Sequence, residues 1–246
     1  MNNKNNQRKT DLEYLNKIEK NWNNDNSDLI DKLKAFTKFV PYTEFPKLFL
    51  KYELFKSIIN VHGSIIECGV YQGSGIFTWA ILSSIFEPVN HIRKIVGFDS
   101  FEGFTSVDKN DSSLKNPHLK KGGLKYTGFE NLLENVKCFD SVRPLGHINK
   151  IELIKGDANF TIKSYKEDNP ELVIALLYLD FDLYEPTKNA LIQLYDLVPK
   201  GGIIVFDELA NKDWPGETIA FKEMFDLKDI ELKRFPFHPQ ISYFIK

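Results

Sequence analysis

An apolar segment that runs directly into a glycine-rich turn constrains this chain more than any other feature. Residues 65–68 are followed by Gly69, Gly73 and Gly75, and then by the apolar residues 76–82. Glycine adopts positive φ angles and lets a ligand approach the backbone without a Cβ in the way. A helix that begins at such a turn directs its free N–H groups toward the same space. The order predicts a buried strand, a ligand-binding turn and a helix.

The spacing of these glycines separates two kinds of nucleotide site. It reads E-x-G-x-x-x-G-x-G from Glu67 to Gly75, whereas the dinucleotide fingerprint is G-x-G-x-x-G. The pattern, with an acid two residues before the first glycine, resembles the S-adenosylmethionine (SAM) loop of class I methyltransferases. A strand–helix turn that binds no ligand is the alternative interpretation.

Composition narrows the class of protein. The 246 residues are 42% hydrophobic and 27% charged, which is typical of a globular protein, and the net charge of −2 favours neither nucleic acid nor an anionic membrane as a partner. No apolar run reaches the roughly 18 residues of a membrane span, and the first ten residues do not resemble a signal peptide. We therefore expect a cytoplasmic protein with a small-molecule substrate, and the choice between a monomer and a homo-oligomer stays open.

The order of elements predicts the fold class. Continuous apolar runs alternate with helical patterns, as in a sheet that helices cover on both faces. We expect an α/β protein with a doubly wound, mostly parallel, seven-stranded sheet. The expected strands are residues 65–68, 94–99, 151–155, 173–180, 202–207, 230–235 and 241–245, and the expected helices of this domain are residues 76–85, 129–138, 187–197 and 218–225.

Three regions are predicted along the chain. Residues 1–60 form a helical N-terminal cap or lid, with helices at 28–40 and 48–61, and residues 61–246 form the methyltransferase-like domain. Residues 104–149 interrupt the alternation and are rich in Lys, Asn, Gly and Ser. Such an insertion either lies over the ligand-binding face of the sheet or is a solvent-exposed surface loop, and both alternatives stay open.

Acidic residues follow the predicted strands. In a doubly wound sheet, ligands bind at the carboxyl ends of the strands. Asp99, after the second strand, has two acceptor oxygens for the two hydroxyls of a ribose, and Asp157, after the third, can accept a hydrogen bond from an adenine amino group. A single acid at such a position is more often a helix cap or a turn former.

A second group of acids points to a metal ion. Asp180 and the pair Asp207-Glu208 end two strands that are neighbours in a parallel sheet, so their carboxylates can converge. Like charges raise each other's pKa, and a hard divalent cation such as Mg²⁺ relieves this with oxygen ligands. In the alternative interpretation Asp182 and Glu208 cap helices, and Asp207 is a metal-free general base.

Four ordered blocks make the chain similar to the macrocin O-methyltransferase (TylF/MycF-type) family and, more distantly, to catechol O-methyltransferase. They are I-E-C-G-V-Y-Q-G-S-G at 66–75, F-D-S-F-E-G-F at 98–104, L-D-F-D-L-Y-E-P-T at 179–187 and G-G-I-I-V-F-D-E at 201–208, and Pro215-Gly216 fits as well. The blocks cover about residues 60 to 225. The family has a second aspartate where this chain has Glu208, which is one carbon longer.

The resemblance implies a Mg²⁺-dependent transfer of a methyl group from SAM to a hydroxyl, typically on a deoxysugar of a natural product. Asp180, Asp207 and Glu208 would hold the metal, and Asp180 would also be the general base. The cofactor-binding residues implied together by the resemblance and the strand ends are Glu67, Gly69, Tyr71, Gly73, Gly75, Asp99, Ser100, Asp157, Ala158 and Asp180. The acceptor would be a sugar hydroxyl on a secondary metabolite or on a nucleotide- or lipid-linked glycan precursor.

Other functions remain open from the sequence. A metal-independent SAM methyltransferase acting on a nitrogen or a carboxylate would keep the glycine turn without needing Asp207 and Glu208. A non-catalytic binding module of the same fold would tolerate the loss of Asp180. A nucleotide-sugar dehydrogenase would need the shorter glycine spacing.

Overall fold

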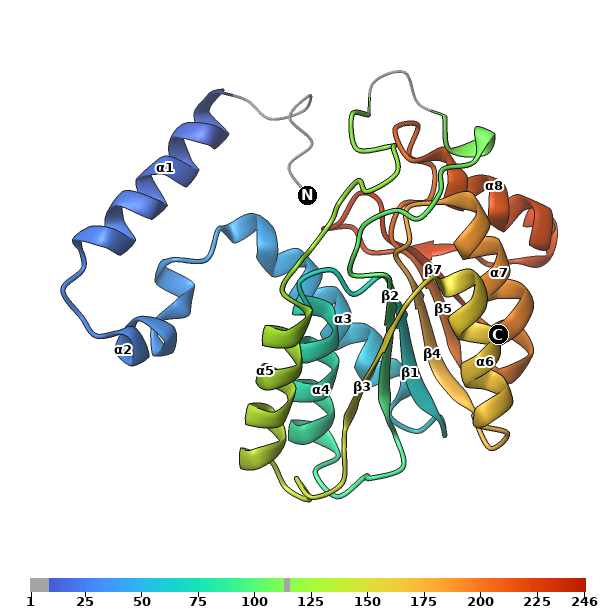
Figure 1. Ribbon diagram of the computed structural model, residues 1–246, viewed down its shortest axis with the longest axis horizontal. Coiled ribbons are helices and arrows are strands. Elements are labelled where there is room, and N and C mark those ends of the chain that lie inside the picture. The colour runs from blue at the N-terminus through green and yellow to red at the C-terminus, as the bar shows by residue number, and fades with distance from the viewer. Residues whose placement is uncertain (1–8, 113–115) are drawn as a thin grey trace. The chain divides into compact units, whose positions relative to one another are not determined.

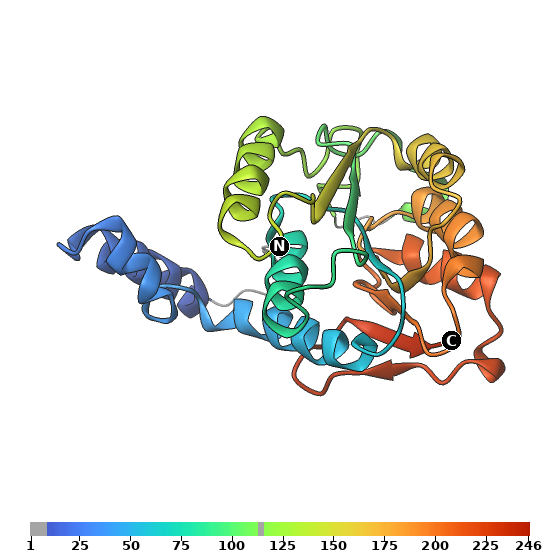
Figure 2. The ribbon, with the colours of Figure 1, turned by 90° about the horizontal axis from the view of Figure 1, so that it is seen from below.

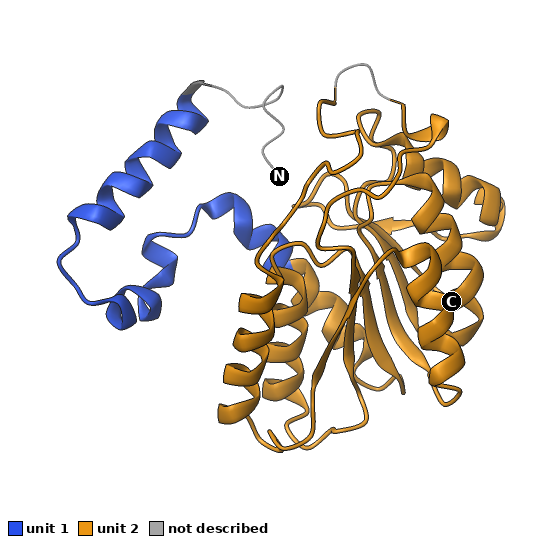
Figure 3. Cartoon of the chain, in the orientation of Figure 1, with its two compact units in different colours: residues 1–49 blue, residues 50–246 orange. Residues whose placement is uncertain are grey.

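The computed structural model describes residues 9–112 and 116–246 of the chain, so residues 1–8 of the predicted cap lie outside the described part. Two compact units, Met1–Phe49 and Leu50–Lys246, divide the chain (Figure 3).

The first unit is helical. It contains α1 (Lys9–Asn24), α2 (Leu29–Lys34), the 3₁₀ turns Phe36–Lys38 and Tyr42–Glu44, and the start of α3 (Phe45–Ile58). The prediction of one helix over residues 28–40 is wrong, because α2 ends at Lys34. A short 3₁₀ turn, Phe36–Lys38, follows instead, and Pro41 disfavours a helical conformation at Val40.

The second unit is built on a seven-stranded sheet, which confirms the predicted fold class. The strands follow the order β3-β2-β1-β4-β5-β7-β6, and among the described pairs β7 runs antiparallel to its neighbours β5 and β6 while the other pairs are parallel. Strand order reverses between β1 and β4, which is where ligands bind in doubly wound sheets. The strands are β1 (Ser64–Cys68), β2 (Ile95–Asp99), β3 (Ile151–Lys155), β4 (Ile174–Leu179), β5 (Ile203–Phe206), β6 (Lys233–Arg234) and β7 (Ser242–Ile245).

Helices cover both faces of the sheet (Figures 1 and 2). On one face lie α3 from Leu50 onward, α4 (Ser74–Phe86) and α5 (Phe129–Val142), and on the other lie α6 (Ala158–Asp168), α7 (Tyr184–Leu194) and α8 (Pro215–Met224). Successive strand residues point to opposite faces, so Ile65 joins the first core and Ile66 the second. Glu67 therefore points to the face that α3 and α4 cover.

Helix α6 was not expected from the sequence. Only Ala158 and Ile162 of its eleven residues are buried, so the apolar periodicity that marks a helix is weak here. The stronger signal is the N-cap, because the Asp157 carboxylate accepts a hydrogen bond from the Asn159 N–H at 2.9 Å.

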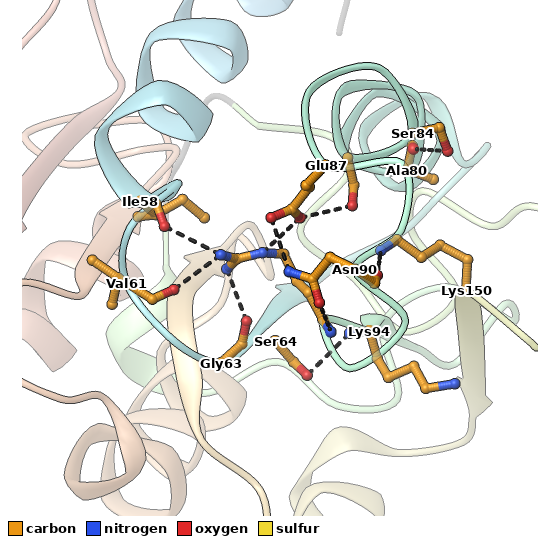
Figure 4. A network of polar contacts seen from close by, with 12 residues as sticks. Ile58, Val61, Gly63, Ser64, Ala80, Ser84, Glu87, Asn90, Lys94 and Lys150 are labelled. Carbon is orange, nitrogen blue, oxygen red and sulfur yellow. Dashed lines mark hydrogen bonds and ion pairs between the residues drawn. The ribbon is translucent and has the colours of Figure 1, made fainter. Parts of the chain in front are cut away.

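A buried arginine joins the elements at the opposite end of the strands from the glycine turn. The Arg93 side chain is 3% exposed, and its Nε lies 2.7 Å from Oε1 of Glu87. Its terminal nitrogens donate to the carbonyl oxygens of Ile58, Val61 and Gly63 at 3.2, 2.9 and 2.8 Å (Figure 4). One guanidinium thus ties the end of α3 and the turn before β1 to the end of α4.

We predict that Arg93→Met lowers the free energy of unfolding by about 3–5 kcal/mol, because it leaves Glu87 and three carbonyl groups without their buried donor. Urea denaturation followed by circular dichroism measures the change. The control is Lys137→Met, which removes an exposed ion pair to Glu134 and is expected to cost less than about 1 kcal/mol. Equal effects of the two substitutions would contradict the prediction.

Candidate active site

The carboxyl ends of four neighbouring strands are aligned. Cys68 pairs with Phe98 on β2 and with Leu179 on β4, and Leu179 pairs with Phe206 on β5. The residues that follow these positions therefore lie at one edge of the sheet: Gly69, Asp99, Asp180 and Asp207. This alignment brings together the glycine turn and the acids that the sequence places at the strand ends.

At two positions of the glycine turn, another part of the chain lies so close that only glycine fits. Gly69 has a φ of +96°, and a Cβ there would lie 1.9 Å from the carbonyl oxygen of Asp180. A Cβ at Gly75, in the first turn of α4, would lie 2.1 Å from Oε1 of Glu67. Between them Gly73 is the left-handed N-cap of α4. The turn therefore packs tightly against the end of β4 and against Glu67.

The Asp99 carboxylate holds the turn in place. Its Oδ2 accepts hydrogen bonds from the N–H groups of Val70 and Tyr71 at 2.9 and 2.8 Å, and its Oδ1 accepts one from Phe101 at 2.6 Å. A carboxylate has about four acceptor sites, so capacity remains for a ribose hydroxyl. The structure adds a positioning role that the sequence did not indicate.

The other predicted cofactor residues make local contacts. Ser100 Oγ donates to the carbonyl of Gly103 at 2.7 Å, Asp157 caps α6, and Ala158 is buried in the first turn of that helix. The ring of Tyr71 is 42% exposed, and its centroid lies 6.0 Å from that of Tyr126 in the insertion. Contact of these residues with a cofactor stays a prediction.

Glu67 lies beneath the turn in a buried ion pair. The residue is 3% exposed, and its Oε2 accepts hydrogen bonds from Lys51 Nζ at 3.1 Å and Trp79 Nε1 at 2.6 Å. Neither partner of Glu67 was predicted from the sequence. A signal exists for Lys51, because it stands between Leu50 and Leu54 on the apolar face of α3.

Asp207 is buried and receives a hydrogen bond from a tyrosine. It is 2% exposed, and the Tyr178 hydroxyl donates to its Oδ1. Burial, together with the charges of Asp207 and Asp180, raises the pKa of Tyr178 well above its usual value, so the phenol keeps its proton and acts as the donor. Sequence reasoning did not single out Tyr178 as a functional residue.

Glu208 is connected to two other segments. Its Oε2 accepts hydrogen bonds from the side-chain amides of Asn211 at 2.5 Å and Gln240 at 2.8 Å. Its backbone N–H donates to Oε2 of Glu217 at 2.8 Å. Burial, with the charges of Asp207 and Glu208 nearby, raises the pKa of Glu217 well above its usual range and favours its protonated form.

The three acids at the ends of β4 and β5 are the predicted ligands of a divalent cation. Carboxylate oxygens are the ligands that Mg²⁺ prefers, so the chemistry of Asp180, Asp207 and Glu208 fits a hard cation. Within residues 9–112 and 116–246, however, no group of three or more His, Cys, Asp or Glu residues is arranged to hold a metal. The amide contacts of Glu208 commit one of its oxygens. The metal role of the three acids stays a prediction.

The first part of the insertion packs beside these acids. Asp111 is 1% exposed, and its Oδ1 accepts a hydrogen bond from the N–H of Tyr184, the first residue of α7, at 2.6 Å. The rings of Phe104 and Trp214 lie 6.0 Å apart, edge to face. These contacts place part of the insertion against the segments that follow β4 and β5.

The strand order, the turn after β1 and the acids at the strand ends define a class I methyltransferase. A family model described as macrocin O-methyltransferase (TylF) matches residues 52–231. The chain belongs to this family and is, by family, a SAM-dependent O-methyltransferase.

Two solved structures of one protein are similar over nearly the whole chain. The first, of the calicheamicin methyltransferase CalS11, has a TM-score of 0.92 and 32% identity and covers 97% of this chain and 93% of that one. The second, of apo CalS11, a TDP-rhamnose 3'-O-methyltransferase, has a TM-score of 0.83 and 30% identity over 97% and 95% of the two chains. The O-methyltransferase NovP, at 21% identity and a TM-score of 0.64 over 81% of this chain and 79% of its own, shares the fold.

A curated relative from Streptomyces olivaceus is 27% identical over 158 residues, or 61% of this chain. It is an 8-demethyl-8-(2,3-dimethoxy-alpha-L-rhamnosyl)-tetracenomycin-C 4'-O-methyltransferase. The match covers 54% of that protein, so the chain spans about half the length of this relative. None of the helices in the described parts of the chain has the length and hydropathy that crossing a membrane requires.

We predict that Asp99→Ala weakens the binding of S-adenosylhomocysteine by at least about tenfold, because the variant loses a ribose acceptor and releases the amides of Val70 and Tyr71. Isothermal titration measures the affinity. Asp226→Ala is the matched control, because that carboxylate also accepts a backbone hydrogen bond, from the Lys228 N–H at 3.1 Å, in the turn after α8. Unchanged affinity in Asp99→Ala would contradict the assignment of this strand end to the ribose.

We predict that Lys51→Met lowers the free energy of unfolding by about 3–5 kcal/mol, because it leaves the Glu67 charge buried without its cation. Adding Glu67→Gln to this variant removes the uncompensated charge, so the double variant is expected to be more stable than Lys51→Met alone. Chemical denaturation of both proteins provides the comparison. A double variant that is less stable than the single one would show that the ion pair is not the cause.

Proposed function

We propose that the protein transfers the methyl group of SAM to a hydroxyl of a deoxysugar, carried by a natural product or by a nucleotide- or lipid-linked precursor, with the help of a divalent cation. Two similar proteins support the sugar acceptor, because one acts on TDP-rhamnose and the other is a methyltransferase for a rhamnosyl tetracenomycin. A cytoplasmic location and the choice between a monomer and a homo-oligomer stay predictions.

The contact between β1 and β4 carries the proposal. The Asp180 N–H donates to the carbonyl of Cys68 at 2.8 Å, and the Asp180 carbonyl lies where a Cβ of Gly69 would be. The backbone of Asp180, the proposed general base, is therefore held directly beside the turn that the family pattern assigns to the cofactor.

The reaction is an in-line displacement at the methyl carbon. The bond from the acceptor oxygen to the methyl carbon forms as the sulfur–carbon bond breaks, and its electron pair stays on sulfur. Asp180 accepts the proton of the hydroxyl, while Asp99 and the turn orient the cofactor. A cation bound by Asp180, Asp207 and Glu208 would lower the pKa of the acceptor hydroxyl and fix its direction.

A metal-independent SAM methyltransferase acting on a nitrogen or a carboxylate is the second candidate. The observation in its favour is the pair of amide hydrogen bonds to Glu208, which occupy one oxygen of a predicted ligand. A more nucleophilic acceptor needs less activation, so such an enzyme would not depend on Asp207.

The test is methyl transfer to a nucleotide-linked deoxyhexose and to a rhamnosylated aglycone, followed by mass spectrometry. We expect addition of one methyl group to a sugar hydroxyl, loss of activity in EDTA and recovery with Mg²⁺. Asp180→Asn is expected to lower kcat by about 10²- to 10⁴-fold, the usual contribution of a general base. Asp196→Asn, at an exposed position after α7, is the control.

Full activity in EDTA together with an unaffected Asp207→Asn variant would favour the second candidate. Absence of transfer to any sugar, with transfer to an amine or a carboxylate, would overturn the proposed acceptor class.

A further inference from the structure

A buried chain of polar side chains connects the glycine turn with Asp207. Lys51 Nζ lies 3.1 Å from Oε2 of Glu67 and 3.8 Å from the centroid of the Tyr178 ring. The Tyr178 hydroxyl in turn donates to Asp207. The four residues come from α3, β1, β4 and the end of β5, and each is at most 6% exposed.

Tyr178 stands two residues before Asp180 on β4, and its side chain lies in the core beneath α3 and α4. Its ring packs edge to face on Trp79, with the centroids 6.0 Å apart. Phenylalanine could make the same ring contacts with Trp79 and Lys51, but it would lack the hydroxyl. The Tyr178 hydroxyl instead donates to a buried carboxylate at the end of β5, at Oδ1 of Asp207.

The geometry points to a positioning role. We propose that Tyr178 orients Asp207 by binding Oδ1, so that the other oxygen faces the acceptor side, and that Lys51 supports both this tyrosine and the cofactor turn through Glu67. The inference rests on the proposed function, since it assigns to Asp207 a task at a divalent cation. A hydrogen bond to a ligating carboxylate fixes its orientation, and losing such a partner typically costs about 10- to 100-fold in metal affinity.

Lys51 links the two halves of the site. An ammonium over an aromatic face is attracted by the ring quadrupole, and this attraction is larger where water is excluded. The same ammonium is the cation of the Glu67 pair. The cofactor turn and the acid at the end of β5 therefore share one buried positive charge.

The experiment compares Tyr178→Phe with the wild type and with Tyr165→Phe. Tyr165 also donates from its hydroxyl to a carboxylate, Oε2 of Glu152 at 2.8 Å, but from α6 on the other face of the sheet. Binding of Mn²⁺ is measured by electron paramagnetic resonance, and binding of S-adenosylhomocysteine by isothermal titration. The Mg²⁺ concentration that gives half-maximal activity is measured in parallel.

We expect Tyr178→Phe to bind Mn²⁺ about 10- to 100-fold more weakly and to need correspondingly more Mg²⁺, while its affinity for S-adenosylhomocysteine stays within about twofold of the wild type. Tyr165→Phe is expected to match the wild type in all three measurements. This combination of results would distinguish an effect of the Tyr178 hydroxyl on metal binding from an effect on the stability of the fold.

Each other outcome is decisive. Equal Mn²⁺ affinity in wild type and Tyr178→Phe would overturn the inference and leave the proposed function intact. A Tyr178→Phe protein that has also lost S-adenosylhomocysteine binding would overturn it too, because the hydroxyl would then support the sheet as a whole. A wild type that binds S-adenosylhomocysteine but no Mn²⁺ would overturn the metal part of the proposed function, and the inference with it.

Discussion

The close approach of the β1 turn to the end of β4 is the constraint on which the rest of the site depends. Gly69 lies so near the Asp180 carbonyl that no side chain fits between them, and the Asp180 N–H binds the carbonyl of Cys68 at 2.8 Å. This contact occurs where the strand order reverses, and in doubly wound sheets the ligand crevice opens there. The glycine turn and the predicted general base are therefore in direct contact at one edge of the sheet.

Three of the buried charged residues lie beneath that edge, next to the core that α3 and α4 cover. Lys51 and Glu67 form an ion pair in the core, and the Asp207 carboxylate is held by a phenol. Burying charges costs stability unless each is paired and hydrogen-bonded, and here each has such a partner. Well-packed apolar side chains of the same volume would stabilise the fold equally well. The buried charges are therefore better explained by a role at the strand ends than by stability.

The sequence allowed the sheet, the glycine turn and the positions of the acids to be predicted, because strands buried on both faces are continuous apolar runs and ligand residues follow strand ends. It did not reveal α6, whose buried positions are too few to give a helical period, or the break after Lys34. Lys51, Trp79 and Tyr178 were also missed. Their contacts join elements that are distant in the chain. An aromatic residue or a lysine within an apolar segment cannot be distinguished, from a single sequence, from any other residue of that segment.

The central claim is that the carboxyl ends of β1, β2, β4 and β5 form one site for SAM and a cation. A crystal structure of the protein with S-adenosylhomocysteine and Mn²⁺, with anomalous data for the metal, tests it most directly. We expect the ribose at Asp99, the methionine end at the turn of Gly69 to Gly75, and an anomalous peak at Asp180 and Asp207. Nucleoside density at another place, or a metal peak remote from both aspartates, would contradict the account.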